Sequence, residues 1–118
     1  MKWFADIPTV YLHRDIVDFR KSINGLAVIV EQDMKLAPCQ EAIFVFCNRR
    51  RDKLKILYWD KSGFVLWYKR LEASKFKWPR KDIQHTITLT SEQLNWLLDG
   101  YDITAMKQHK TLHFESFS

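Results

Sequence analysis

The feature that most constrains the fold is a run of apolar residues, AIFVFC, at residues 42–47. An uninterrupted apolar run of this length is typical of a strand that is covered on both faces. The next segment, KLKILYW at residues 53–59, alternates at its start, so that Leu54, Ile56 and Tyr58 share one face. After the turn sequence DKSG, in which Gly63 suits a positive φ, residues 64–71 return as FVLWYKRL. We therefore predict a meander of three antiparallel strands.

Two shorter strands and one helix are predicted outside the meander. Residues 9–12, TVYL, and residues 85–89, HTITL, are rich in β-branched and aromatic side chains, which favour strands. The segment that follows, TSEQLNWLLDG, predicts a helix. Thr90 or Ser91 can cap its N-terminus, and Gly100 can end it.

A second helix is predicted over about residues 16–35, before the apolar run. Asp15 or Asp18 can cap its first turn, whereas Asn24 and Gly25 weaken the pattern in its interior. Its apolar residues recur every three or four positions, which places them on one helical face: they are Ile16, Phe19, Ile23, Leu26 and Val30.

Together these elements predict an α+β fold, with an antiparallel sheet of four to six strands and two helices on one face. A chain of 118 residues suits a single domain over residues 1–118, with residues 101–118 as a tail or an edge strand. Cys39 and Cys47 do not make a disulfide framework, and we see neither a signal peptide nor a membrane span. We expect a cytoplasmic protein.

Charge is distributed unevenly along the chain. Residues 49–81 contain twelve Lys and Arg against three Asp and Glu, whereas the rest contains seven basic and eleven acidic residues. This asymmetry predicts a basic face, and phosphate backbones are the commonest partners of such faces. An anionic membrane or an acidic protein surface would also fit.

The predicted nucleic-acid-binding residues lie in this basic segment. Three adjacent guanidinium groups at residues 49–51 can straddle a phosphate backbone, or they belong to a solvated loop in which Asp52 neutralises one of them. Trp59 and Trp67 can stack on bases, or pack in the core as strand aromatics usually do. The full predicted set is Arg49, Arg50, Arg51, Lys53, Lys55, Trp59, Trp67, Lys69, Arg70, Lys77, Arg80 and Lys81.

Two neighbouring segments have alternative interpretations. KFKWPRK, at residues 75–81, alternates charges and rings, which fits a basic arm along a groove and equally an edge strand with its apolar side down. Arg20 lies in a segment of balanced charge, so we expect it to pair with a nearby acid.

Catalytic and metal-binding patterns are weak. Three acids, Asp52, Asp60 and Glu72, occupy or adjoin turns, and their spacing does not bring them together around an ion. His109 and His113 are four residues apart, which alone is a weak signal for a metal site. The sequence predicts no enzyme, no metal and no cofactor.

A family resemblance is carried by these same residues. The segment FVFCNRRRDKLKILYWDKSGFVLWYKRLEASKFKWP, followed by ITLTSEQLNWLLDG, closely resembles the small accessory protein, often called TnpB, of the insertion-sequence-sixty-six family of bacterial transposable elements. The upstream VYLH…DFRKSINGL fits the same family, so the resemblance covers residues 10–100.

The resemblance implies a role in transposition beside a separate, larger transposase. The expected partners are the DNA of the element ends, bound with weak sequence specificity, and that transposase; no membrane partner is expected. The alternative is an adaptor that docks the transposase without recognising DNA directly.

Overall fold

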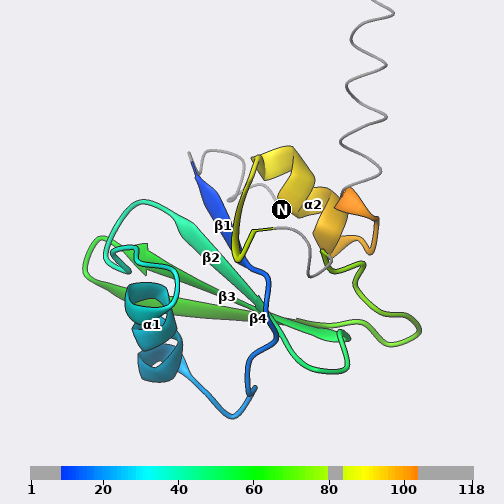
Figure 1. Ribbon diagram of the computed structural model, residues 1–118, viewed down its shortest axis with the longest axis horizontal. Coiled ribbons are helices and arrows are strands. Elements are labelled where there is room, and N and C mark those ends of the chain that lie inside the picture. Colours follow the sequence, from blue (N-terminus) through cyan, green and yellow to red (C-terminus); the bar gives the residue numbers. More distant parts are fainter. Residues whose placement is uncertain (1–8, 80–83, 104–118) are drawn as a thin grey trace, which may run out of the picture.

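A five-stranded sheet forms the centre of the computed structural model, which describes residues 9–79 and 84–103 (Figure 1). Its strand order is β4-β3-β2-β1-β5, and most neighbouring strands are antiparallel. With two helices this is an α+β fold, as predicted. The strands are β1 (Val10–His13), β2 (Ile43–Cys47), β3 (Lys53–Asp60), β4 (Gly63–Arg70) and β5 (Thr86–Leu89), and the helices are α1 (Ile23–Gln32) and α2 (Ser91–Leu98).

The predicted meander is confirmed in β2, β3 and β4. β3 and β4 pair over their whole lengths, from Lys53 opposite Arg70 to Asp60 opposite Gly63. The two-residue loop between them takes its positive φ at Lys61, with a φ of 52°, and not at Gly63. The sheet also contains one parallel pair, because β1 lies beside β2 in the same direction and α1 belongs to the connection between them.

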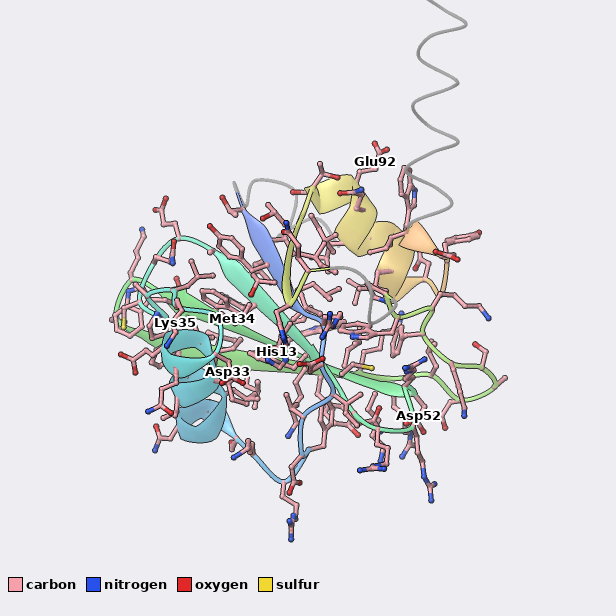
Figure 2. All side chains as sticks on the ribbon, in the orientation of Figure 1. His13, Asp33, Met34, Lys35, Asp52 and Glu92 are labelled. Carbon is pink, nitrogen blue, oxygen red and sulfur yellow. The ribbon has the colours of Figure 1, made fainter. Side chains whose placement is uncertain are left out.

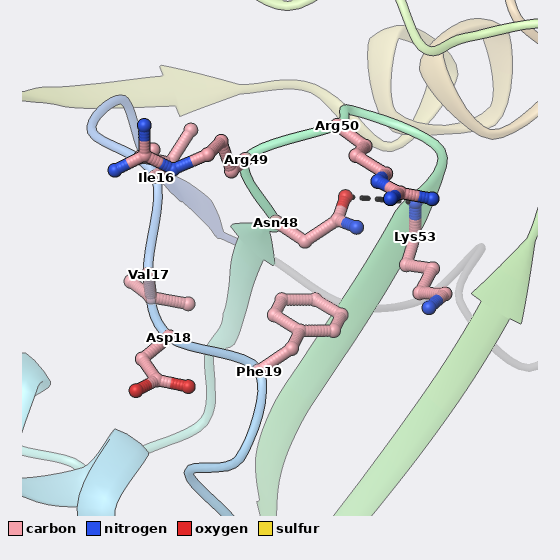
Figure 3. A pocket seen from close by; sticks show the side chains of 8 residues that line it. All are labelled: Ile16, Val17, Asp18, Phe19, Asn48, Arg49, Arg50 and Lys53. Carbon is pink, nitrogen blue, oxygen red and sulfur yellow. Dashed lines mark hydrogen bonds between the residues drawn. The ribbon is translucent and has the colours of Figure 1, made fainter.

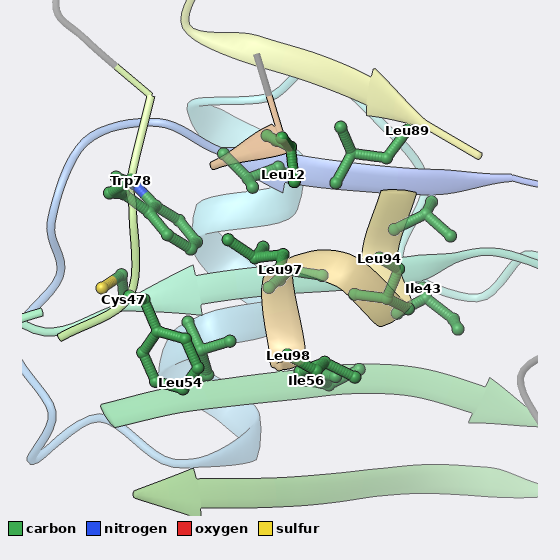
Figure 4. Close-up of a cluster of buried hydrophobic side chains, with 14 residues drawn as sticks. Leu12, Ile43, Cys47, Leu54, Ile56, Trp78, Leu89, Leu94, Leu97 and Leu98 are labelled. Carbon is green, nitrogen blue, oxygen red and sulfur yellow. The ribbon is translucent and has the colours of Figure 1, made fainter. Parts of the chain in front are cut away.

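The two helices cover opposite faces of the sheet, and their predicted placement on one face is wrong. On one face, Leu94 and Leu97 of α2 pack with Ile43 and Ile56 of the strands (Figure 4). On the other face, α1 packs against neighbouring strand residues, as Leu26 does with Phe44 and Leu57. The apolar run in β2 explains this arrangement, because all five residues of that strand are buried and both its faces therefore need cover.

The first helix is shorter than predicted. α1 begins after Ser22 and ends at Gln32, and it runs without interruption through Asn24 and Gly25. Residues 16–21 precede it as irregular chain, so neither acid of that region caps it. The backbone N–H of Val17 donates to the carbonyl of Cys47 at 2.9 Å, which fastens this chain to the end of β2.

The second helix has the predicted N-terminal cap. The hydroxyl of Thr90 accepts a hydrogen bond from the backbone N–H of Gln93, and the Gln93 side chain accepts one from the backbone N–H of Thr90. Gly100, just after the helix, has a φ of 91°, which suits glycine. The capping box explains why this helix was predictable from sequence.

Several predicted features lie outside the described residues: Arg80, Lys81, His109, His113 and most of the segment 101–118. Within the described ranges, neither helix has the length and apolar character needed to cross a lipid bilayer.

Candidate nucleic-acid interface

Residues 48–53 join β2 to β3 and form what we call the arginine turn. The buried Asn48 organises this turn, because its Oδ1 accepts hydrogen bonds from the backbone N–H groups of Asp52 and Lys53 at 3.2 and 3.0 Å. Its Nδ2 donates to Oδ1 of Asp52 at 2.7 Å, and its carbonyl accepts from the backbone N–H of Arg51 at 3.1 Å. The backbone of the turn is therefore held from inside, without any arginine side chain.

The three arginines of the turn, Arg49, Arg50 and Arg51, are exposed. Within the part of the chain that the structure describes, no carboxylate oxygen lies within 4.0 Å of their guanidinium nitrogens. Asp52 is engaged by Asn48 instead, and that hydrogen bond is the main reason why the pKa of the Asp52 carboxyl is lowered. Asp52 therefore forms no ion pair with the arginines of its own turn, although its charge still acts on Arg50 at longer range.

The chain after β4 passes beside the arginine turn. The backbone N–H of Phe76 donates to the carbonyl of Arg51 at 2.7 Å, and the indole N–H of Trp78 donates to the carbonyl of Arg14 at 2.6 Å. Both rings are buried in the core, whereas Lys75 and Lys77 are exposed. In the described part of the segment, residues 75–79, the apolar side faces the core as one of the two interpretations expected, although these residues do not join the sheet as a strand.

These residues give one end of the sheet a cluster of positive charge. Lys53, at the start of β3, is half-buried and follows the arginine turn directly. We call the cluster the basic end, and it consists of Arg49, Arg50, Arg51, Lys53, Lys75 and Lys77.

Cations further along the strands have structural partners. Lys55 Nζ donates to the carbonyls of Phe19 and Lys21, both at 2.8 Å, and lies 4.8 Å from the centroid of the Phe19 ring. Burial lowers the pKa of the Lys55 ammonium group, against an opposing effect of the charge on Asp18. On the opposite face, Lys69 Nζ donates to the carbonyl of Leu98 at the end of α2, at 2.8 Å. These two lysines fasten surrounding chain to the sheet.

Arg70 is also occupied. Its Nε lies 2.6 Å from Oε2 of Glu72, and this pair is exposed. Exposed ion pairs of this kind contribute little to stability. Arg70 lies beside the basic end, opposite Lys53, and the pair with Glu72 reduces the net charge that it adds there.

The two predicted tryptophans lie on opposite faces of the β3–β4 hairpin. Trp59 stands across from Phe64, and their rings meet edge to face with centroids 5.1 Å apart. Trp67 stands across from Ile56 and packs against the core under α2. The strand pairing therefore divides the predicted set between two faces, and no single face carries all of its cations and rings.

A groove lies between the arginine turn and the irregular chain before α1 (Figure 3). Its volume is about 560 Å³. One wall of this groove, which contains Ile16 and Phe19, was not predicted from the sequence. The spacing of these two residues fits a helix, and it also fits a loop that packs on the end of the sheet, as observed. The lining residues are Ile16, Val17, Asp18, Phe19, Asn48, Arg49, Arg50 and Lys53.

Among the described residues that line the groove, Asp18 is the one acid, and it is paired with Arg20. The Arg20 guanidinium approaches Asp18 Oδ2 to 2.6 Å, and the backbone N–H of Arg20 donates to Oδ1 at 2.9 Å. These hydrogen bonds lower the pKa of the Asp18 carboxyl strongly, so the group stays ionised. The expected pairing of Arg20 with a nearby acid is confirmed.

The acids of the basic segment do not converge. Asp52 and Asp60 lie at opposite ends of β3, which an eight-residue strand separates by roughly 26 Å. Glu72 is held by Arg70. Among residues 9–79 and 84–103, no group of three or more His, Cys, Asp or Glu side chains is placed to hold a metal ion.

Comparison with known protein families shows the family to which the chain belongs. The profile of the IS66 Orf2 like protein family matches residues 8–108, which is most of the chain. The chain belongs to the IS66 Orf2-like family. The family match includes the arginine turn, both walls of the groove and the segment with Lys75 and Lys77.

Two curated relatives support this membership. The chain is 39% identical over 93 residues to the uncharacterized protein y4jC of Sinorhizobium fredii, covering 78% of each chain. It is 33% identical over 93 residues to the uncharacterized protein y4hO of the same organism, covering 79% of this chain and 80% of the relative. No solved structure gives a significant match. Membership in the IS66 Orf2-like family suggests a role accessory to transposition.

Proposed function

We propose that this IS66 Orf2-like protein is a non-catalytic accessory factor of transposition that binds the DNA of its element in the bacterial cytoplasm. The observation that carries the proposal is the arginine turn, where three exposed arginines have no carboxylate partner among the described residues. A guanidinium presents a planar fork of donors that matches the oxygens of a phosphate. The turn therefore offers phosphate-binding groups that the fold itself does not use.

The proposed contact surface is the basic end. Its lysines, Lys53, Lys75 and Lys77, widen the cluster around the arginine turn. Phosphate contacts position a protein on DNA but carry no sequence information. We therefore expect binding that is weakly specific and that weakens steeply as salt rises, because each neutralised phosphate releases condensed counterions.

Several residues of the predicted set are left out of this surface. The ammonium groups of Lys55 and Lys69 are bound to backbone carbonyls, and Trp67 packs against the core. Moving any of these groups to a ligand would cost an existing hydrogen bond or buried contact. Arg70 has a weaker internal partner and remains a predicted contact at the edge of the surface. Trp59 lies near the opposite end of β3, so it stays a prediction outside this surface.

The test is a fluorescence titration of the purified full chain with duplex DNA from the element end and with scrambled duplex of equal length, across a salt series. We expect both duplexes to bind at low salt with similar affinity, and both affinities to fall as salt rises. A variant with Arg49, Arg50 and Arg51 all changed to Ala should bind both much more weakly. No binding at low salt, or binding that salt does not affect, would refute the proposal.

The larger transposase is the other proposed partner, and the same titration separates it from DNA. If neither duplex binds, but a complex with the transposase survives nuclease treatment and depends on the arginine turn, the protein is an adaptor. In that case the basic end docks an acidic protein surface, and the DNA-binding proposal is wrong.

A further inference from the structure

We propose that the groove beside the arginine turn is a binding site for one unpaired nucleotide of DNA. This inference rests on the proposed function and deepens it, because it names the form of DNA that the protein prefers. The groove would take a nucleotide whose base is free of its partner strand, as at a frayed end, an overhang or a single strand. The remaining cations of the basic end would follow the adjoining phosphates.

The size and lining of the groove suit such a ligand. Its volume of about 560 Å³ lies within the range of about 300–1,000 Å³ that small-molecule sites occupy. One wall carries the apolar side chains of Ile16, Val17 and Phe19. Ile16 is 39% exposed and therefore gives the groove an apolar surface that is open to solvent.

The charges around the groove are arranged for an anionic ligand with an apolar part. Arg50 and Lys53 line it on the side away from Ile16 and Val17, and in the view of Figure 3 the Arg49 side chain extends across Ile16. Asp18 is the one acid among the described lining residues, and Arg20 already engages its carboxylate. A phosphate on the cationic side and a base against the apolar side would therefore meet complementary surfaces.

Phe19 adds a flat surface that is held in place. Lys55 Nζ lies 4.8 Å from the ring centroid and also binds the Phe19 carbonyl, while the Tyr68 ring packs at a tilt with its centroid 6.3 Å away. Proteins that bind single strands combine such fixed rings with nearby cations. Phe19 is partly exposed and lines the groove, so the part of its ring that these contacts leave open is the surface proposed for a base.

Duplex DNA could use only half of this site. In a duplex the bases are stacked and paired, so a surface groove meets phosphates alone. An unpaired nucleotide can place its base against the apolar wall as well, where it can stack on the aromatic ring of Phe19. We therefore expect about tenfold tighter binding of DNA with an overhang than of blunt duplex.

The experiment is fluorescence anisotropy of the full chain at low salt with three probes: a blunt duplex, the same duplex with a short thymidine overhang, and oligothymidine. Ile16→Ser removes apolar surface from the groove without changing its charge. Val28→Ser is the matched control, because Val28 is 45% exposed on α1 and lies outside the groove lining. Phe19→Leu is a second groove variant, and thermal melting checks that each variant is folded.

We expect the wild type to favour the overhang and the single strand. Ile16→Ser and Phe19→Leu should each lower affinity for those two probes by about three- to tenfold, leave blunt-duplex affinity unchanged, and so remove most of the preference. Val28→Ser should change nothing.

Other results overturn the inference in distinguishable ways. If the wild type binds blunt duplex as tightly as the overhang, the groove is not a nucleotide site, but the proposed function stands. If the groove variants weaken all three probes equally, or if polyglutamate displaces oligothymidine as well as unlabelled oligothymidine does, the groove responds only to charge and the inference is wrong. If no probe binds, the inference and the proposed function fall together.

Discussion

The arginine turn and the β3–β4 hairpin carry similar numbers of cations but use them differently. In the hairpin, Lys55 and Lys69 extend from opposite faces and donate to backbone carbonyls of the chain packed on each face. In the turn, Asn48 and Asp52 supply the side-chain hydrogen bonds, and the side chains of the arginines contribute none of them. Sequence composition alone does not distinguish the cations of the turn from those of the hairpin. The structure separates those that stabilise the fold from those available to a partner.

The largest expected difference is within the segment KFKWP, where alternate residues face the core and the solvent. Trp78 is 7% exposed, and its indole N–H donates to the Arg14 carbonyl. Trp78→Ala should lower the free energy of unfolding by about 3–5 kcal/mol, because it leaves a cavity and removes that donor. Lys77→Ala should change stability by less than about 0.5 kcal/mol. Urea denaturation of both variants measures this difference. Equal losses in the free energy of unfolding would contradict the placement of Trp78 in the core and of Lys77 in solvent.

The next comparison is between two lysines on the same face of β3. Lys55→Met removes the donor to two carbonyls and should lower the free energy of unfolding by about 1–3 kcal/mol. Lys53→Met, two residues earlier, has no such bond to lose and should change it by less than about 0.5 kcal/mol. DNA affinity should respond in the opposite order, falling with Lys53→Met and not with folded Lys55→Met. Urea denaturation and DNA titration of both variants are the measurements. If Lys53→Met lowered stability and Lys55→Met lowered DNA affinity, then Lys53 would be the lysine that stabilises the fold and Lys55 the one that contacts DNA.

Arg51→Gly should move stability and binding in opposite directions. Arg51 has a φ of 62°, which glycine adopts more readily than arginine does. The free energy of unfolding should rise by about 0.5–1 kcal/mol, while affinity for duplex DNA falls because one cation is lost. Melting and titration of the same preparation test this. A loss of stability would mean that the Arg51 side chain supports the fold after all.

The smallest effect is expected from Asp52→Asn as pH falls. Because the pKa of Asp52 is lowered in the folded state, its ionised form adds stability above about pH 4, and this contribution is lost as pH falls through the folded pKa. The melting temperature of the wild type should therefore exceed that of the variant at neutral pH, and the difference should shrink in acid. A difference that salt abolishes at neutral pH would indicate instead that Asp52 is an arginine partner.

Much of the sheet and the second helix could be predicted from local patterns. The apolar run of β2, the alternation of β3 and the capping residues Thr90 and Gln93 act over a few neighbouring residues, so a single sequence shows them. The parallel pairing of β1 with β2 is different, because it depends on how the chain through α1 returns to the sheet.

The wrong predictions concern sequence patterns that are compatible with two different structures. Ile16 and Phe19 continue the helical spacing of α1, yet they belong to a loop fastened to the sheet end by the N–H of Val17. The prediction that both helices lie on one face of the sheet is wrong because β2 is fully buried. A fully buried strand needs cover on both faces, and α1 and α2 each cover one of them. The partners of Lys55 and Lys69 are carbonyls distant in sequence, which no local pattern reveals.

The most direct test of this division compares two charge-matched double variants. One removes Arg49 and Arg50 from the arginine turn; the other removes Lys35 and Lys61, which are exposed elsewhere, with Lys35 far from Asp52 in Figure 2. Each changes two cations to Ala, and the measured quantity is the slope of log affinity for blunt duplex against log salt. The arginine pair should reduce the steepness by about two, at about 0.9 per phosphate contact, and the lysine pair should leave it unchanged. Equal reductions in both variants would show that net charge, and not the arginine turn, binds the DNA.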